Sequence, residues 1–399
     1  MNTGSLAWRY LWARPLATVL NLLLLTLGLA AITLLLLVRT QIDRAFERDL
    51  AGIDAVVGAK GSPLQLILSG VFHLDVPTGN IPLTEAQALA QDARVAQLIP
   101  LSLGDSYRGF RIVGTTRDYP AHYGAEVAQG AWWQAPMEAV LGAQVARTTG
   151  LAVGGQFAGA HGLGAGGEEH GDEPYRVSGV LAPCGCVLDR LVLTSSESVW
   201  RVHEGEPEDE AERQALEAER EITLALVRYR SPLAAVTFPR YVNSATSMQA
   251  AAPALEITRL LRMVGVGTDV LRGFAAVLLL TAGLSVFIAL WSAVRERRAD
   301  LALLRMLGAP PRRVAGLLLA EALWLAALAT LLGLAAGHGL TALLGWMLEN
   351  DQSVPLRGLI WLAEELWVPA LALTVAALAS ALPVLAAYRS SAVSLLNER

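Results

Sequence analysis

The chain has 399 residues, of which 54% are hydrophobic and only 17% charged, and its mean hydropathy is +0.44. This balance is more apolar than that of an ordinary soluble domain, and it indicates an integral membrane protein with a substantial soluble part. The net charge of −5 is mild and not basic, so we expect no nucleic-acid partner.

Four apolar runs are long enough to cross a bilayer, which requires roughly 20 residues. We place them at residues 16–40, 270–294, 314–347 and 366–388. A cleavable signal peptide is the competing interpretation of the first run. Its apolar core would be only about 7–15 residues long, whereas this run extends to Arg39, so we expect an uncleaved anchor.

The distribution of arginine in the short loops predicts the orientation in the membrane. Residues 295–313 contain six arginines, whereas residues 348–365 contain one arginine and four carboxylates. Because short loops rich in arginine stay on the cytoplasmic side, we assign 295–313, the N-terminus (1–15) and the tail (389–399) to the cytoplasm. The large segment 41–269 is then on the outer side.

These observations predict an α-helical integral membrane protein with four transmembrane helices and a large α+β domain between the first and second helices. Within that domain we expect helices at 83–98, with Thr84 as a candidate N-cap, and at 140–149. Runs of β-branched and aromatic residues predict strands at 110–114, 175–181, 191–194 and 222–229. Helical extensions of the first two spans would form a stalk.

The chain has two cysteines, Cys184 and Cys186, which flank Gly185 in the outer domain. An oxidising compartment permits a disulfide, but a bridge between residues i and i+2 closes a very small loop. A strained redox pair, a soft-metal site and two small residues in a turn all remain open.

Histidines are concentrated in the outer domain, and two of them belong to a glycine-rich acidic segment at 161–173. Imidazole and carboxylate ligands together suit zinc or a similar divalent ion. The candidate ligands are His161, His170 and Asp172. The alternative is a solvated loop, because the segment has no fixed ligand spacing.

The chain lacks the motifs of an ATP-binding or catalytic protein. The only lysine, Lys60, is followed by Gly61, so no Walker A motif is present. No nucleophile elbow or His-Glu-x-x-His helix occurs either, and we assign no catalytic residue and no cofactor to this chain. Glu321 and His338 lie near opposite ends of the third span, about 25 Å apart along a helix, and form no polar path across it.

The cytoplasmic loop carries a resemblance to a known family. Residues 295–314 form a charged, helix-prone segment that stops at Gly308 before Pro310. This segment, the tail 383–396 and the order of one span, an outer domain and three spans resemble the FtsX-like permeases of ABC transporters, including the macrolide exporter and lipoprotein-releasing permeases. The outer segments 140–154, 111–114 and 177–181 are similar to the periplasmic core domain of the same class.

The resemblance implies a non-catalytic permease in the bacterial inner membrane, with its large domain in the periplasm. It implies two copies of this chain, a homodimer of a separate ATPase subunit that holds ATP and Mg²⁺, contact with membrane lipid, and a periplasmic or lipoprotein partner. The cytoplasmic loop would be the coupling helix. The residues we assign to ATPase coupling are Arg295, Glu296, Arg297, Arg298, Leu301, Leu304, Arg305, Met306 and Gly308.

The expected function is mechanotransmission: ATP hydrolysis in the partner drives a periplasmic movement that exports or extracts a lipoprotein, lipid, peptide or hydrophobic compound. One alternative is a regulatory membrane scaffold that controls a periplasmic partner. Another is a permease that handles a metal or haem through the histidine-rich segment.

Overall fold

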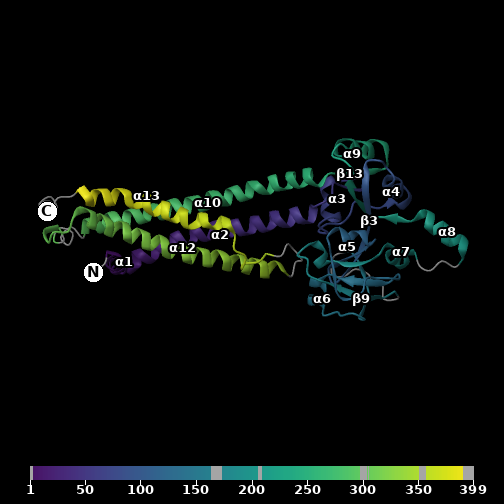
Figure 1. Ribbon diagram of the computed structural model, residues 1–399, viewed down its shortest axis with the longest axis horizontal. Helices are drawn as coiled ribbons and strands as arrows, with labels where there is room; N and C mark the ends of the chain where they lie inside the picture. Colours follow the sequence, from purple (N-terminus) through teal and green to yellow (C-terminus); the bar gives the residue numbers. More distant parts are fainter. Residues whose placement is uncertain are drawn as a thin grey trace. The chain divides into compact units, whose positions relative to one another are not determined.

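The chain forms two compact units in the computed structural model (Figure 1). The first unit comprises residues 1–43 and 264–399, and the second comprises residues 44–263. Helices α2 and α10 each belong in part to both units. The structure describes residues 3–162, 173–204, 209–296, 303, 305–349 and 356–389.

The first unit is helical. Among the described residues, four helical segments are long and apolar enough to cross a membrane. Their large outward-facing residues are apolar, such as Leu280 at 76% exposure, which fits contact with lipid or with another apolar surface. The helices of this unit are α1 (Thr3–Trp12), α2 (Pro15–Leu50), α10 (Pro253–Glu296), α12 (Pro311–Glu349), the 3₁₀ turn η2 (Ala363–Leu366) and α13 (Trp367–Arg389).

Two glycines bring helix α12 close to helix α2. A Cβ placed on Gly333 would lie 2.7 Å from Cβ of Leu29, and a Cβ on Gly337 would lie 2.5 Å from Cβ of Thr33. Small residues four apart on one helical face allow helices to approach closely in a membrane, where packing replaces the hydrophobic effect as the driving force. Buried alanines of α12, such as Ala326, belong to the same apolar core as Leu29.

A buried glutamine fixes the loop between α12 and α13 to helix α2. The side chain of Gln41 donates to the carbonyl of Arg357 (3.1 Å) and accepts from its amide (2.8 Å). Because both polar ends of the amide are satisfied, Gln41 is buried at little cost.

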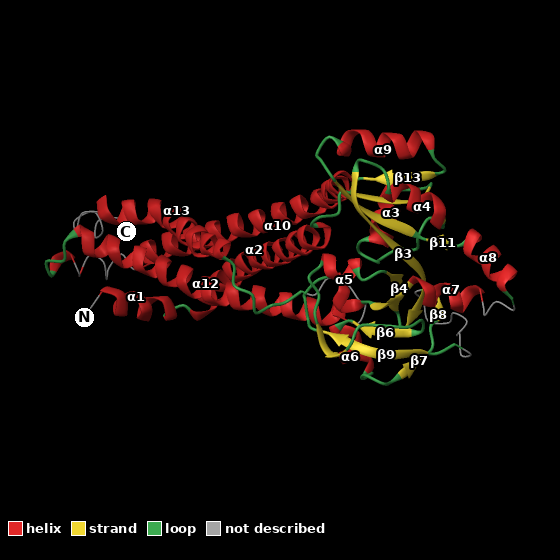
Figure 2. Ribbon diagram, turned by 45° about the vertical axis from the view of Figure 1, so that its right-hand side comes forward, coloured by secondary structure: helices red, strands yellow, loops and turns green. Residues whose placement is uncertain are grey.

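The second unit is an α+β domain built on a mixed sheet (Figure 2). Its main strand order is β13-β1-β12-β3-β4-β10-β6-β9-β5, with β7 and β8 attached to β9 and β3. The pairs β4–β10 and β6–β9 are parallel, and the other pairs are antiparallel. The strands are β1 (Ala55–Ala59), β3 (Val95–Tyr107), β4 (Phe110–Thr115), β5 (Val127–Gly130), β6 (Glu138–Leu141), β7 (Gln156–Phe157), β8 (Ala160–His161), β9 (Tyr175–Leu181), β10 (Val192–Ser195), β12 (Leu224–Tyr229) and β13 (Met248–Ala251).

Short helices cover the sheet on both faces, and α9 lies alongside β13 (Figure 2). A separate two-stranded ladder pairs β2 (Ile81–Pro82) with β11 (Glu221–Ile222). The helices are α3 (Pro63–Gly70), α4 (Leu83–Ala90), α5 (Asp118–His122), α6 (Ala143–Thr149), the 3₁₀ turn η1 (Val187–Arg190), α7 (Ser196–Glu204), α8 (Glu210–Glu219) and α9 (Ala234–Ala245).

The strands bury side chains on both faces because their residues alternate between two apolar clusters. On β12, Leu224 and Leu226 join the cluster that also contains α3 residues, whereas Ala225 and Val227 join the cluster beneath α9. This two-residue alternation is the geometry of any strand. It explains why residues 224–227 of β12 form a continuous apolar run and not an alternation of apolar and polar residues.

The predicted helix at 83–98 is wrong beyond residue 90. Helix α4 ends at Ala90, and strand β3 begins at Val95 after a turn in which Asp92 accepts a hydrogen bond from the amide of Arg94 (2.9 Å). Pro82, not Thr84, occupies the N-cap position. Pairing of β3 with β12 and β4 outweighs the helical pattern that continues past Ala90.

The predicted helix at 140–149 is also partly wrong, because strand β6 continues to Leu141 and α6 starts only at Ala143. Gly142 separates them at a close approach: a Cβ there would lie 2.2 Å from the carbonyl oxygen of Leu188. The predicted strand 175–181 is confirmed as β9. The predicted strand 222–229 is divided, because the side chain of Thr223 bonds to the backbone of Leu103 between β11 and β12.

Candidate functional site

The loop between α10 and α12 exposes apolar side chains on a helical turn. Leu303, Met306 and Leu307 are 54%, 59% and 77% exposed. The amide of Leu307 donates to the carbonyl of Leu303 (2.9 Å), which closes the turn. Gly308 then takes a φ of +91°, a left-handed conformation that suits glycine and ends the helix before the prolines. The turn therefore presents a short apolar surface to whatever lies outside this chain.

The charged residues of the same loop are only partly described. Glu296 forms an ion pair with Arg14, which directly precedes α2, and Arg295 is its neighbour at the end of α10. Arg305 is half-buried within the turn. Four further predicted coupling residues lie outside the described residues: Arg297, Arg298, Leu301 and Leu304.

Two polar groups on α12 are buried in the helical unit. Glu321 is 4% exposed and lines a cavity of about 40 Å³ together with Arg14 and Asn21. Near the other end of the helix, Nε2 of His338 lies 2.9 Å from Oε2 of Glu365, and Nδ1 lies 2.5 Å from the carbonyl oxygen of Gly358. The sequence analysis missed Glu365 as the partner of His338, since 27 residues separate them and only the turn η2 brings them together.

The ends of α2 and α10 that belong to the second unit pack into its main core. Phe46 and Leu50 of α2 contact this core, and Phe46 packs edge-on against Phe72 at 4.8 Å. On α10, Ile257 is buried in the same cluster, with Leu260 packed against it. The ends of both helices that belong to this unit are therefore anchored in its core.

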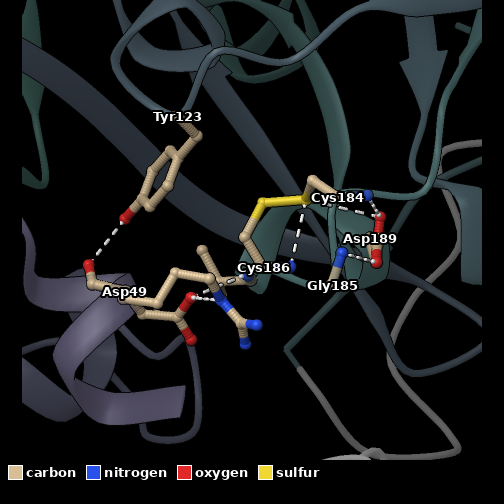
Figure 3. The surroundings of a disulfide bond; sticks show 8 residues. Asp49, Tyr123, Cys184, Gly185, Cys186 and Asp189 are labelled. Carbon is tan, nitrogen blue, oxygen red and sulfur yellow. Dashed lines mark hydrogen bonds and ion pairs between the residues drawn. A yellow bond between two sulfur atoms is a disulfide. The ribbon is translucent and has the colours of Figure 1, made fainter. Parts of the chain in front are cut away.

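Asp49, in the last turn of α2, connects that helix to two other parts of the domain (Figure 3). Its Oδ1 accepts a hydrogen bond from the amide of Val187 (3.2 Å), and its main-chain oxygen accepts one from the hydroxyl of Tyr123 (3.0 Å). The side chain of Asp49 is only 8% exposed. Arg48 lies 3.6 Å away, and Arg190 interacts with it electrostatically, while burial lowers the pKa of Arg190.

The two cysteines form a disulfide directly before η1 (Figure 3). Both carboxylate oxygens of Asp189 cap this loop: Oδ1 accepts from the amide of Cys184 (3.0 Å) and Oδ2 from that of Gly185 (2.7 Å). Gly185 takes a φ of +64°, and Cys186 is buried in the main core. The bridged loop positions the amide of Val187, which holds Asp49.

His73 and Tyr119 form a buried polar pair in the main core of the α+β domain. Nε2 of His73 is 2.8 Å from the hydroxyl of Tyr119, and both side chains are buried. Burial lowers the pKa of His73 well below its ordinary value of 6.5, and Arg111 and Arg190 lower it further. Burial likewise raises the pKa of Tyr119. His73 is therefore a neutral hydrogen-bonding residue of the core.

The structure places one of the three predicted metal ligands in a cluster. His161 on β8 lies beside Asp105 on β3 and His203 on α7, with candidate ligand atoms all within 4.8 Å of one another. His170 and Asp172 lie outside the described residues. The sequence analysis missed Asp105 and His203 because neither is near residue 161 in the chain.

Two family models match successive parts of the chain. Residues 272–392 match the FtsX-like permease C-terminal model, and residues 18–227, more than half of the chain, match the MacB-like periplasmic core domain model. The chain belongs to the MacB- and FtsX-like family of ABC-transporter permeases. The predicted family is therefore confirmed, and so is the fold class of four membrane helices with a periplasmic α+β domain between the first two.

Two solved structures are similar to the permease. One is the periplasmic region of MacB from Actinobacillus actinomycetemcomitans, at 13% identity and a TM-score of 0.35, covering 53% of this chain and 95% of that one. The other is the extracellular domain of the noncanonic ABC-type transporter YknZ from Gram-positive bacteria, at 12% identity and a TM-score of 0.31, covering 50% and 98%. Comparison with curated proteins gives no match.

Proposed function

We propose that this permease transmits the energy of ATP hydrolysis in a separate ATPase subunit to its periplasmic domain, from a position in the bacterial inner membrane. Two copies of the chain would act with two copies of the ATPase. ATP and Mg²⁺ would be held by that partner, because the chain has no Walker A motif. The movement would export or extract a lipoprotein, lipid, peptide or hydrophobic compound.

The exposed apolar turn at Leu303–Leu307 carries this proposal. Large apolar side chains on a polar, arginine-rich cytoplasmic loop cost free energy in water and commonly mark a contact with another protein. The arginines of the loop would pair with acidic groups around a groove of the ATPase, while Met306 and Leu307 enter it. The turn lies directly between α10 and α12, so a displacement of the ATPase would act on both helices.

The anchored ends of α2 and α10 support transmission to the periplasmic domain. A helix is stiff along its axis, and both of these helices insert apolar side chains into the domain core. Asp49 adds a directional polar contact to the disulfide-bridged loop. A movement of α2 would therefore pass to the sheet through packed groups.

An ion-driven mechanism is less well supported by the described part of α12. Glu321 and His338 are 17 residues apart, or about 25 Å along the helix, and His338 pairs with Glu365 at its own end. A proton relay needs polar groups at successive depths.

The docking surface is tested by replacing Met306 and Leu307 together with glutamate. Charges there would repel an apolar groove, so we expect the copurifying Walker A protein, identified by mass spectrometry from the native membrane, to be lost. Leu359→Glu is the matched control, since Leu359 is 91% exposed in the opposite loop and its replacement should leave copurification unchanged. An undisturbed complex in the double variant would refute docking at this turn.

A second measurement separates transport from regulation. In a reconstituted complex, a transporter hydrolyses ATP faster when its lipid, peptide or lipoprotein substrate is present. A scaffold that only controls a periplasmic partner would hydrolyse ATP at a rate independent of such compounds and would respond to the partner alone.

A further inference from the structure

Three side chains with metal-binding groups meet on the periplasmic domain, and the proposed transmission of movement does not use them. Asp105 lies on β3, His161 on β8 and His203 near the end of α7. Nδ1 of His161 is 3.1 Å from Oδ1 of Asp105, and Nε2 of His203 is 3.7 Å from the same oxygen. The two imidazole rings are 5.3 Å apart between their centroids.

The backbone explains why these residues converge. Asp105 and His161 are directly opposite each other in the antiparallel pair of β3 and β8, so their side chains project from the same face. The register of β3 with β4 shifts between Leu103 and Ser106, and a bulge of this kind re-aims the side chain within it. The carboxylate of Asp105 is thereby buried, at 2% exposure, with the two rings on its solvent side at 48% and 37%.

The hydrogen bond of His203 to its own helix fixes the tautomer of the neutral ring. The ring nitrogen that faces the carboxylate of Asp105 then carries a lone pair and no proton. Nδ1 of His203 is 2.7 Å from the carbonyl oxygen of Val199, which only accepts hydrogen bonds, so Nδ1 carries a proton. In the neutral ring Nε2 is then an acceptor, and it faces another acceptor, Oδ1 of Asp105. Metal-binding histidines commonly donate their second N–H to a backbone carbonyl in this way.

We propose that Asp105, His161 and His203 form a binding site for a divalent transition-metal ion of the zinc type. Neighbouring ligand atoms around tetrahedral zinc lie roughly 3.3 Å apart, given metal–ligand bonds of about 2.0–2.1 Å. The separations of 3.1 and 3.7 Å from the shared oxygen are close to this value. Two imidazoles and one carboxylate favour zinc over calcium or magnesium, which prefer oxygen ligands.

Among the residues that the structure describes, three side chains offer ligand atoms at this site, and the two rings are partly exposed. Three protein ligands with an open position are typical of sites that exchange a water or an external ligand, whereas purely structural zinc sites are closed by four. A bound ion would also tie β8 and α7 to β3, which lies within the main sheet.

The alternative is a hydrogen-bonded cluster in which protonated histidines pair with Asp105 and no ion binds. The full-length permease, purified in detergent and stripped with a chelator, is titrated with Zn²⁺ against a chromophoric chelator. Co²⁺ provides a second readout through its visible ligand-field band. We expect one ion per chain with a dissociation constant of about 1 µM or lower.

Each of Asp105→Asn, His161→Gln and His203→Gln should weaken zinc binding at least tenfold. Both histidines are partly exposed and Asn has the shape of Asp, so the fold should survive, which circular dichroism checks. His122→Gln, on α5 outside the cluster, should bind as the unsubstituted protein does. Binding weaker than about 10 µM, or binding that all three cluster variants retain, would overturn the site.

Discussion

At the scale of single residues, Asp49 fixes the end of α2 to the disulfide-bridged loop. Asp49→Ala removes the acceptor of the Val187 amide and leaves Arg48 and Arg190 without this carboxylate. We expect a loss of about 1–3 kcal/mol in the free energy of unfolding and faster hydrogen exchange at the Val187 amide. Chemical denaturation and exchange mass spectrometry measure the two effects.

Asp43→Ala is the control for that prediction on the same helix. Asp43 pairs with Arg39 four residues away on an exposed surface, at 41% and 56% exposure, and such pairs contribute only about 0.3–0.5 kcal/mol. Equal losses in the two variants would mean that Asp49 does not act as an anchor.

His73 predicts how the stability of the periplasmic domain depends on pH. Burial lowers the pKa of His73 below 6.5. At a pH just below 6.5, His73 therefore binds a proton in the unfolded chain and stays neutral in the folded core. Stability from this residue is complete above pH 6.5 and is lost as the pH falls toward the folded pKa, with a slope approaching about 1.4 kcal/mol per pH unit. Chemical denaturation of the full chain at pH values between about 5 and 7.5, which bracket the ordinary pKa of histidine, measures this slope.

His73→Gln should reduce this acid sensitivity, whatever its effect on absolute stability. His122, whose pKa burial also lowers, contributes in the same direction but is only half-buried. His122→Gln should therefore change the slope less. An unchanged slope in His73→Gln would show that other groups determine the acid response.

At the scale of elements, the contact between α2 and α12 depends on glycine. Gly337→Leu would force a side chain into Thr33, and the helices would have to separate. We expect a loss of about 1–3 kcal/mol and a lower midpoint of thermal unfolding in detergent, followed by tryptophan fluorescence. Gly339→Leu is the matched control two residues away, because a Cβ there meets nothing within 4 Å. Similar midpoints for the two variants would contradict close packing at Gly337.

The elements also show where local sequence patterns stop being sufficient. The alternating run of β9 has the same bounds in sequence and structure. The helix predicted at 83–98 is too long because residues 91–98 suit a helix locally, whereas residues 91–94 form a turn and pairing with β12 makes residues 95–98 part of a strand. Gly333 and Gly337 were not recognised as a packing motif, since the partner helix is about 300 residues away in the chain.

At the scale of the whole molecule, α2 connects the helical unit to the periplasmic domain without a break. Arg44→Pro removes a helical hydrogen bond at an exposed position of this helix and should kink or break it, at a cost of about 3 kcal/mol. If α2 transmits movement, ATP-dependent changes in hydrogen exchange within residues 44–263 should disappear while the ATPase subunit still copurifies.

Arg44→Ala is the control, because it removes the same charge and keeps the helix intact. It should preserve the ATP-dependent changes in exchange. If these changes also persist in Arg44→Pro, a rigid α2 is not required for transmission and the proposed route through Asp49 is wrong.

The sequence by itself determined the membrane helices, the family and the position of the arginine-rich loop between α10 and α12. The length of the apolar runs, the excess of arginine in one short loop and the end of a helix at Gly308 are local signals. Each is carried by consecutive residues, because a bilayer or a helix end constrains neighbouring positions in the chain. The same holds for the missing Walker A motif.

Only the tertiary structure decided which distant residues act together. Asp49 meets Val187, His338 meets Glu365, and Asp105 meets His161 and His203 across separations that no local pattern encodes. These contacts follow from strand register, a bulge and the docking of helix ends, which arise when the sheet and the helices pack. The histidine-rich segment predicted His161 as a candidate metal ligand, and the fold places Asp105 and His203, from elsewhere in the chain, beside it.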